Sequence, residues 1–323
     1  MLGLILLLQT LTIAVSGPPG SAEYLPLRVA EAEGLFEREG LAVTLKATRA
    51  ESGAAEALAQ GQADLAATSL DAVLRFGPRL PMQAPRLVYA LTAAPPVALL
   101  VATPHGDLVK SVEDLPGTRV GLASPGAPEH AWFGWLLARA GVSVAQTSIV
   151  SHGSRGLVQA VESGDVHAGL VPEPWASRLV AEGRARVLVD FRTPAAVGQA
   201  LGSPTVNAAV FARADRLPRA RELGAVARAL LAAERRLATA PPAELAARLP
   251  QRVVTPRDEF DARVEASRGL YLADGLVSTD QVQDTIALIR AHLPLPASYR
   301  VPQPDELLHA EPLRRALGGE RAR

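Results

Sequence analysis

The sequence predicts an α/β fold built from two similar lobes, and two observations support that prediction. Short apolar strands alternate with helical segments over the first two-thirds of the chain, which is typical of mostly parallel sheets flanked by helices. The segments Gly53-AAEALAQ-Gly61 and Gly156-LVQAVES-Gly164 repeat one glycine spacing at an offset of 103 residues, and a short apolar strand follows each. We therefore expect each lobe to present one strand end at a shared place.

The individual elements follow from the apolar pattern and from the glycines and prolines that interrupt it. LTIAVS, at residues 11–16, is the first expected strand, and LAVTLKAT, at 41–48, alternates with the period of two that marks another. Further strands are expected over residues 64–68, 87–91, 97–102, 148–150, 166–171, 185–189 and 205–211. Helices are expected over 21–36, 52–60, 70–76, 129–140, 156–163, 214–239, 260–272 and 279–291, followed by a loose surface tail beyond residue 294.

Composition excludes several classes of function. The chain has 323 residues with 33 basic and 33 acidic side chains, and this balance argues against a nucleic-acid partner or an acidic membrane. Cysteine is absent, so disulfides, thiolate nucleophiles, iron–sulfur clusters and a lipoprotein anchor are excluded. No phosphate-binding glycine loop, nucleophile elbow or metalloprotease helix is present. We expect neither a cofactor nor a metal.

The N-terminus leaves the compartment open. MLGLILLLQ, at residues 1–9, is apolar but too short to span a bilayer, and it lacks the positive start of a secretory signal. Three interpretations compete: a signal truncated by a wrong start codon, an atypical signal or anchor, and the beginning of a cytoplasmic protein.

A candidate site lies in SGDVHAGLVPEPW, at residues 163–175, where an apolar strand ends at two prolines. In open α/β sheets, ligands bind outside the carboxyl ends of the strands. Pro172 and Pro174 force an extended exit that presents Glu173 and Trp175 there. The equivalent strand of the first half ends at another polar cluster. If the lobes face each other, that cluster lies across a cleft from Glu173 and consists of Thr68, Ser69 and Asp71.

The remaining candidate contacts each have a simpler structural alternative. SPGAPEH, at 124–130, joins a strand to a helix. Ser124 and Gly126 could bind an oxyanion at the start of that helix. The structural alternative is that the segment only caps the helix. Arg155 could form a bidentate fork with an anion, or it is solvated. His130 could face the cleft, and Tyr24 could close the cleft or lie in the core. The set of candidate ligand contacts is completed by Ser16 and Asn207.

The order of several segments resembles the solute-binding proteins of ABC importers, of the nitrate/sulfonate/taurine and thiamine-pyrimidine-precursor type. The matching segments are AEAEGLFEREGLAVTL (30–45), GQADLAATSLDAVL (61–74), DLPGTRVGLASPG (114–126), EHAWFGWLLARAGV (129–142), SGDVHAGLVPEPW (163–175) and YLADGLVSTDQVQ (271–283). His167 departs from the pattern, because the family usually has Asp there. The resemblance implies a periplasmic-binding-protein-like fold of type II, in which a ligand is caught by hinge closure.

The resemblance also implies a domain plan and partners. Lobe 1 would comprise residues 10–100 and 207–295, and lobe 2 residues 101–206, with chain crossings near 99–103 and 205–210 and a tail over 296–323. The protein would be a periplasmic or exported monomer and not an enzyme. It would capture a small organic molecule, such as a sulfonate, a pyrimidine or a similar heteroaromatic or zwitterion, and deliver it to ABC permease and ATPase subunits.

Two alternatives remain open. One is an enzyme of the same fold, similar to a pyrimidine synthase or a menaquinone-pathway dehydratase, with Glu173 or Asp71 as acid or base; the missing cysteines argue against the synthase. The other is a sensor subunit that signals through a partner. Whatever the role, Glu173 and Asp71 in the expected cleft would repel nitrate or a sulfonate unless Arg155 or backbone donors compensate.

Overall fold

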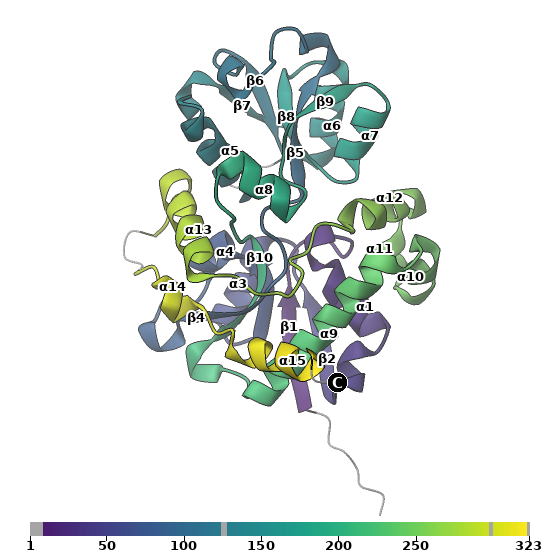
Figure 1. The fold of residues 1–323 in the computed structure, drawn as a ribbon, viewed down its shortest axis with the longest axis vertical. Coiled ribbons are helices and arrows are strands. Elements are labelled where there is room, and N and C mark those ends of the chain that lie inside the picture. Colours follow the sequence, from purple (N-terminus) through teal and green to yellow (C-terminus); the bar gives the residue numbers. More distant parts are fainter. Residues whose placement is uncertain (1–8, 124–127, 297–299, 322–323) are drawn as a thin grey trace, which may run out of the picture.

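The protein folds into two lobes, each built around one five-stranded sheet (Figure 1). The structure is a computed structural model that describes residues 9–123, 128–296 and 300–321. Lobe 1 occupies the lower part of Figure 1 and lobe 2 the upper part. Helices flank both sheets, so the predicted α/β class is confirmed.

Lobe 1 contains both the N-terminal part of the chain and its C-terminal third. Its strands are β1 (Gln9–Val15), β2 (Leu41–Ala47), β3 (Leu65–Ser69), β4 (Pro85–Ala90) and β10 (Ala208–Arg213), in the order β2-β1-β3-β10-β4. β1 is parallel to β2 and β3, whereas β10 is antiparallel to its neighbours. Ile13 and Val15 enter one hydrophobic cluster and Ala14 another, so both faces of this sheet are covered.

The helices of lobe 1 are α1 (Leu25–Ala32), α2 (Leu35–Arg38), α3 (Glu51–Ala59), α4 (Leu70–Phe76), α9 (Ala220–Thr239), α10 (Pro242–Arg248), α11 (Gln251–Val254), α12 (Arg257–Ser267), α13 (Thr279–His292), α14 (Pro304–Leu307) and α15 (Glu311–Arg321). The single helix expected over 21–36 is broken. It consists of a 3₁₀ turn, η1 (Ala22–Tyr24), followed by α1 and α2, because Gly34 takes a φ of +65° between them.

Lobe 2 repeats the sheet plan of lobe 1. Its strands are β5 (Val97–Ala102), β6 (Arg119–Leu122), β7 (Ser148–Ser151), β8 (Ala168–Pro172) and β9 (Ala185–Asp190), in the order β7-β6-β8-β5-β9. Its helices are α5 (Pro128–Arg139), α6 (Gly153–Ser163), α7 (Trp175–Ala181) and α8 (Pro194–Leu201). β3 and β8 are both the third strand of their sheet, and they start 103 residues apart. The repeat seen in the sequence is therefore real.

The chain crosses between the lobes twice, and the two crossings are hydrogen-bonded to each other. The first runs from the end of β4 to Val97, since β5 already belongs to the sheet of lobe 2. The expected position at 99–103 is therefore too far along the chain. The second crossing immediately precedes β10. Thr205 Oγ1 donates to the carbonyl of Ala93 (2.7 Å), and the amide of Asn207 donates to the carbonyl of Thr92 (2.8 Å).

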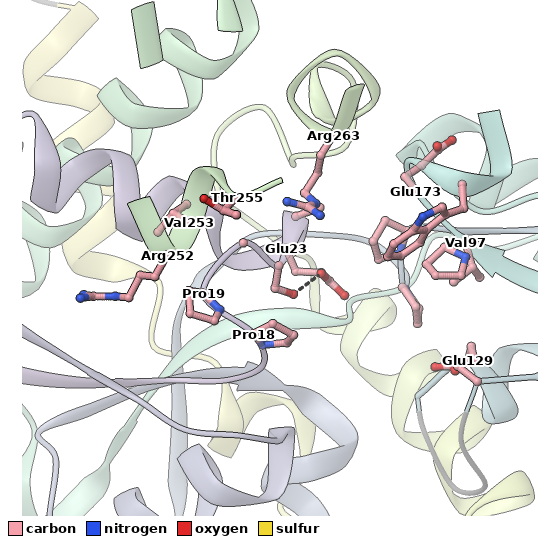
Figure 2. Close-up of a pocket in the computed structure, with 18 residues that line it drawn as sticks. Pro18, Pro19, Glu23, Val97, Glu129, Glu173, Arg252, Val253, Thr255 and Arg263 are labelled. Atoms are coloured by element: carbon pink, nitrogen blue, oxygen red, sulfur yellow. Dashed lines mark hydrogen bonds between the residues drawn. The ribbon is translucent and has the colours of Figure 1, made fainter. Parts of the chain in front are cut away.

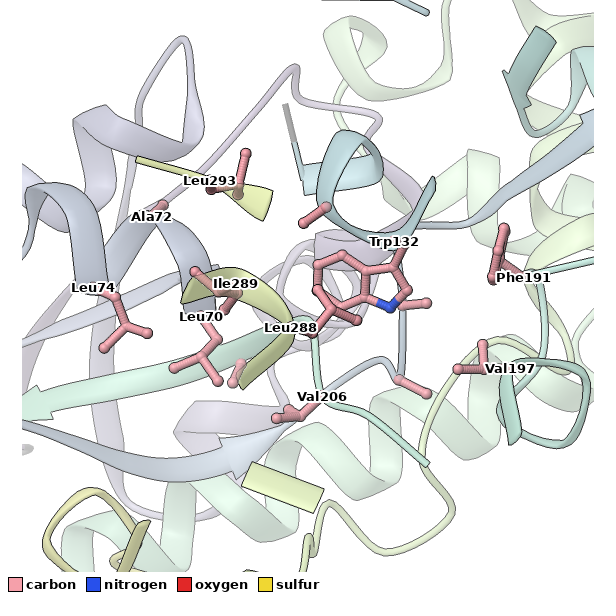
Figure 3. Close-up of a cluster of buried hydrophobic side chains, with 14 of the residues drawn as sticks. Leu70, Ala72, Leu74, Trp132, Phe191, Val197, Val206, Leu288, Ile289 and Leu293 are labelled. Carbon is pink, nitrogen blue, oxygen red and sulfur yellow. The ribbon is translucent and has the colours of Figure 1, made fainter. Parts of the chain in front are cut away.

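One edge of the two lobes is joined by an apolar contact. α5 of lobe 2 packs against α13 of lobe 1. Trp132 of α5 is fully buried in a cluster with Leu70, Leu288 and Ile289 of lobe 1, as Figure 3 shows. Its indole Nε1 donates to Thr205 Oγ1 (3.2 Å), so the same side chain also contacts the second crossing. This contact joins the two lobes along one edge.

Residues 300–321 pack against lobe 1, which corrects the expectation of a loose tail. α15 packs on α9, and Leu313 is buried in the core of lobe 1. The amide of His309 donates to the carbonyl of Leu87 in β4 (2.9 Å). Apolar side chains within a stretch rich in Arg, Pro and Glu are enough to hold it against the lobe. No helix in the described part of the chain is long and apolar enough to cross a bilayer.

Candidate functional site

A cleft of about 350 Å³ lies between the lobes at the crossings (Figure 2). Lobe 1 contributes the loop after β1 and residues of α11 and α12, and lobe 2 contributes residues near the ends of β6 and β8 and the start of α5. Pro95, Pro96 and Val97 of the first crossing also line it. The other lining residues are Pro18, Pro19, Gly20, Ser21, Ala22, Glu23, Ala123, Glu129, Pro172, Glu173, Trp175, Arg252, Val253, Thr255 and Arg263.

Glu51, the first residue of α3, is the centre of a polar network in lobe 1. Its Oε2 atom accepts hydrogen bonds from Tyr24 Oη (2.7 Å), Thr68 Oγ1 (2.9 Å) and the amide of Ser69 (2.8 Å). Burial raises the pKa of this carboxyl to about 7, although the hydrogen bond from Tyr24 acts in the opposite direction. The charges of Glu23 and Asp71 raise it further.

Glu129 enters the cleft from lobe 2. Its side chain is 9% exposed, and it forms no hydrogen bond or ion pair with another residue in the described part of the chain. Burial raises the pKa of Glu129 to about 7, and the negative charges of Glu23, Asp71 and Glu51 contribute to that rise. A position in the first turn of α5 favours a carboxylate, but here burial outweighs that effect.

Glu23 faces Glu129 from the lobe 1 side, as Figure 2 shows. Its Oε2 atom accepts a hydrogen bond from Ser21 Oγ (2.8 Å). Burial raises the pKa of Glu23, and the positive charge of Arg263 on α12 acts against that rise. Arg252 and Arg263 are the two basic side chains among the described residues that line the cleft.

Glu173 and Trp175 both line the cleft, in the place that their strand end predicts. The Glu173 carboxylate is engaged within lobe 2: Oε1 accepts hydrogen bonds from Arg192 Nη1 (2.6 Å) and Ser177 Oγ (2.8 Å). Arg192 also pairs with Asp190 (2.8 Å). Trp175 is partly exposed and borders a second hollow, between α7 and α12. The indole of Trp175 is therefore accessible to a ligand at the mouth of the cleft, whereas the Glu173 carboxylate already has hydrogen-bond partners within lobe 2.

The other predicted contacts on lobe 1 lie beneath the cleft and do not line it. Ser16, Tyr24, Thr68, Ser69, Asp71 and Asn207 are all buried. Buried polar atoms without a partner in the described part of the chain occur at three of them: Ser69 Oγ, Asp71 Oδ1 and Asn207 Oδ1. These three residues are neighbours, because β10 pairs with β3 at Ala208 and Ser69, and the amide of Leu70 donates to the carbonyl of Asn207 (2.9 Å).

The remaining predicted residues belong to lobe 2. His130, beside Glu129 on α5, is partly buried, and burial lowers its pKa. Arg155 is exposed at the start of α6 and does not line the cleft. Ser124 and Gly126 lie outside the described residues. No group of His, Asp or Glu suited to a metal ion occurs among the residues that the structure describes.

Sequence reasoning missed Glu23, Glu51, Arg252 and Arg263 as site residues. Glu51 begins a helix directly after a strand and a turn, and this position at the carboxyl edge of a sheet is a signal that could have identified it. Glu129 lies within the SPGAPEH segment, at 124–130, but the sequence did not single it out as a site residue. No local pattern identifies Arg252 and Arg263, because they reach the cleft only through the return of the chain to lobe 1.

Two α/β lobes, two crossings and a cleft at strand ends define the class of periplasmic-binding-protein folds. The chain belongs to the NMT1/THI5-like family, whose model matches residues 21–200. No curated protein sequence matches it.

Solved structures with the same fold cover nearly the whole chain. A protein from Bordetella bronchiseptica RB50 is 24% identical, with a TM-score of 0.73 over 97% of this chain and 98% of that chain. A putative periplasmic sulfonate-binding protein, SsuA, from Methylobacillus flagellatus KT is 20% identical (TM-score 0.69; 97% and 95%). The periplasmic nitrate-binding protein NrtA from Synechocystis PCC 6803 is 15% identical (0.66; 98% and 90%). The desulfurization enzyme DSZB also shares the fold, at 17% identity (0.61; 97% and 100%).

Proposed function

We propose that this protein is the solute-binding receptor of an ABC importer, which captures a small organic molecule in the cleft and delivers it to permease and ATPase subunits. The observation that carries the proposal is a cleft of about 350 Å³ lined by residues of both lobes and of the first crossing. That volume is within the range of small-molecule sites. Membership of the NMT1/THI5-like family and a fold shared with SsuA and NrtA support the same role.

Closure of the lobes provides the mechanism of capture. A ligand shifts the equilibrium between open and closed states only if it makes better contacts in one of them. A ligand in this cleft would contact Glu23 and Arg263 of lobe 1 and Glu129 and Trp175 of lobe 2 at once. Simultaneous contact is complete only when the lobes approach, so binding favours closure around the edge where Trp132 joins α5 to α13.

Trp175 and the proline walls favour an organic ligand with an apolar or flat part. Aromatic stacking and burial of apolar surface, at about 25 cal/mol per Å², would supply affinity, and the charged groups would supply orientation. We assign Trp175 the role of a stacking contact and Tyr24, Thr68, Ser69 and Asp71 the role of the floor below it. An exported monomer that meets its permease outside the cytoplasm is the arrangement that this function requires.

The receptor function is tested by native mass spectrometry of freshly purified protein, followed by a thermal-shift screen. We expect a co-purified small molecule, and a saturating ligand at 100 times its dissociation constant stabilises the fold by about 2.7 kcal/mol. Trp175→Ala should remove most of the shift, whereas Leu108→Ala, at an exposed apolar position of lobe 2, should retain it. A protein that carries no solute and responds to no cleft-sized molecule contradicts the receptor function.

One observation favours a second candidate, an enzyme of the same fold. Glu51 and Glu129 have pKa values of about 7, which suit general acid–base catalysis near neutrality, and DSZB is an enzyme with this fold. The chain has no cysteine, so carboxylates such as Asp71, Glu173 or these two would have to carry the chemistry. Turnover of a bound solute that is lost in Asp71→Asn or Glu173→Gln would support this alternative, and unchanged solute after long incubation would argue against it.

A further inference from the structure

Two carboxylates line the cleft from opposite lobes, and two more in lobe 1 act on them through their negative charge. Glu23, Glu51 and Asp71 belong to lobe 1 and Glu129 to lobe 2, and each of Glu51 and Glu129 is acted on by the negative charges of others in the set. Glu23 and Glu129 line the cavity itself. The cluster therefore places a negative potential on the ligand from two sides.

Several of these acidic groups lack a partner, and this second observation is independent of their charge. Glu129 is more than nine-tenths buried, its carboxylate is directed into the cleft in Figure 2, and no other described residue bonds to it. Glu51 uses only Oε2 for its three hydrogen bonds, and Oε1 has no hydrogen-bond partner among the described residues. Asp71 Oδ1 is likewise buried and unpaired within the described chain. Asp71 Oδ1 is the fully buried one of these atoms, and an acceptor without a protein donor favours a ligand that supplies one.

No hydrogen bond or ion pair in the described chain joins Glu129 to Arg252 or Arg263, the two arginines that line the cleft. Arg75 pairs with Asp71 at 3.4 Å, through the other carboxylate oxygen. Arg263 acts on Glu23 and on Glu259, and burial lowers its own pKa. The charges that act most strongly on Glu129 are all negative. An anion placed beside Glu129 would therefore meet repulsion from lobe 1 and lobe 2 together.

We propose that the ligand carries a cationic nitrogen group, such as a protonated amine or an amidinium, held between Glu23 of lobe 1 and Glu129 of lobe 2, which line the cleft, with the negative charge of Glu51 adding to theirs. This inference rests on the proposed receptor function and names the substrate class of the same cleft. A nitrogen cation provides several N–H donors for the carboxylates of Glu23 and Glu129. Trp175 lies on the same cleft wall as Glu173 and offers a face to the rest of the ligand or to the cation itself.

Binding of such a cation is coupled to proton release. Glu129 is acted on by Glu23, Asp71 and Glu51. Glu51 is acted on by Glu23 and Asp71, and its hydrogen bonds from Tyr24 and the amide of Ser69 do not offset the effect of burial, so the pKa of each carboxyl remains at about 7. Affinity for a permanent cation should rise with pH through 7, by up to about tenfold per pH unit for each proton released. Affinity for a neutral ligand of the same shape should change little over this range.

The test uses three molecules of one shape and different charge: benzamidine, benzamide and benzoate. Isothermal titration calorimetry on the full chain at pH 8 should give the order benzamidine, benzamide, benzoate, from tightest to weakest. Between pH 6 and pH 8 the affinity for benzamidine should increase at least tenfold. Glu51→Gln and Glu129→Gln should each weaken benzamidine by about tenfold or more and leave benzamide within a few-fold.

Two exposed glutamates provide matched controls. Glu56→Gln lies on α3 with Glu51, and Glu113→Gln lies in lobe 2, as Glu129 does; both remove the same charge outside the cleft, and both should bind benzamidine as the unmodified chain does. If benzoate or the sulfonate MOPS binds at least as tightly as benzamidine, the proposal of a cationic ligand is wrong, but the receptor function is not contradicted. Binding of none of the probes also overturns the charge assignment; only the absence of any co-purified solute as well overturns the receptor.

Discussion

Removing the charge of Glu129 should stabilise the ligand-free protein at alkaline pH. Below pH 4.5 this carboxyl is protonated in both the folded and the unfolded chain. As the pH rises, the unfolded chain releases the proton first, and the folded chain retains it up to about pH 7. At about 1.4 kcal/mol per tenfold change in a proton equilibrium, roughly 3 kcal/mol of stability is lost over this interval. Glu129→Gln carries no charge at any pH and avoids that loss.

Urea unfolding followed by circular dichroism measures this effect. Glu129→Gln should have a free energy of unfolding up to about 3 kcal/mol above that of the unmodified chain at pH 8, and a difference below about 1 kcal/mol at pH 5. Glu113→Gln, at an exposed position, should stay within about 0.5 kcal/mol at both values. A Glu129→Gln protein that is equally or less stable at pH 8 would refute the claim that this carboxylate is buried without compensation.

Three further substitutions probe how the lobes are built, each by urea unfolding. Trp132→Ala should lower the free energy of unfolding by about 3–5 kcal/mol, because the side chain is fully buried and donates to Thr205. A loss below about 1 kcal/mol would contradict the inference that Trp132 joins the two lobes. Tyr89→Phe removes the hydrogen bond to Glu234 (2.9 Å), whose pKa burial raises to about 8, so the loss of about 1–3 kcal/mol should be larger at pH 9 than at pH 6. Leu313→Ala should cost about 2–5 kcal/mol, a value that a loose tail could not produce.

Local patterns in the sequence predicted most of the strands and the likeness of the two halves. The run Val97–Ala102 is apolar and buried throughout, and the expected strand has the same bounds as β5. The glycine-spaced repeat predicted β3 and β8 at equivalent places. These features are encoded within a few residues of each other, so a single chain is enough to recognise them.

Features that depend on distant segments could not be predicted. The first crossing was expected within β5. The apolar sequence of a buried strand is compatible with either sheet, and only the pairing of β5 with β8 and β9 places it in lobe 2. Glu173 was identified as a cleft residue, but its partner Arg192 lies nineteen residues further along the chain and was not foreseen. The network around Glu51 joins the start of α3 to Tyr24 and Thr68, and no spacing rule connects these three positions.

The proposed cation would also explain what keeps the lobes apart before a ligand arrives. Closure of the lobes in the proposed receptor would move Glu129 of lobe 2 towards Glu23, Glu51 and Asp71 of lobe 1, and each ionised pair would then repel more strongly as water leaves the cleft. A cation between them converts that repulsion into attraction, which is the differential contact that hinge closure requires. An anion would add to the repulsion, and a neutral molecule would leave it in place. Small-angle scattering should therefore detect compaction with benzamidine at pH 8 and none with benzoate. Equal compaction with both ligands would contradict the claim that the charge of the ligand drives closure.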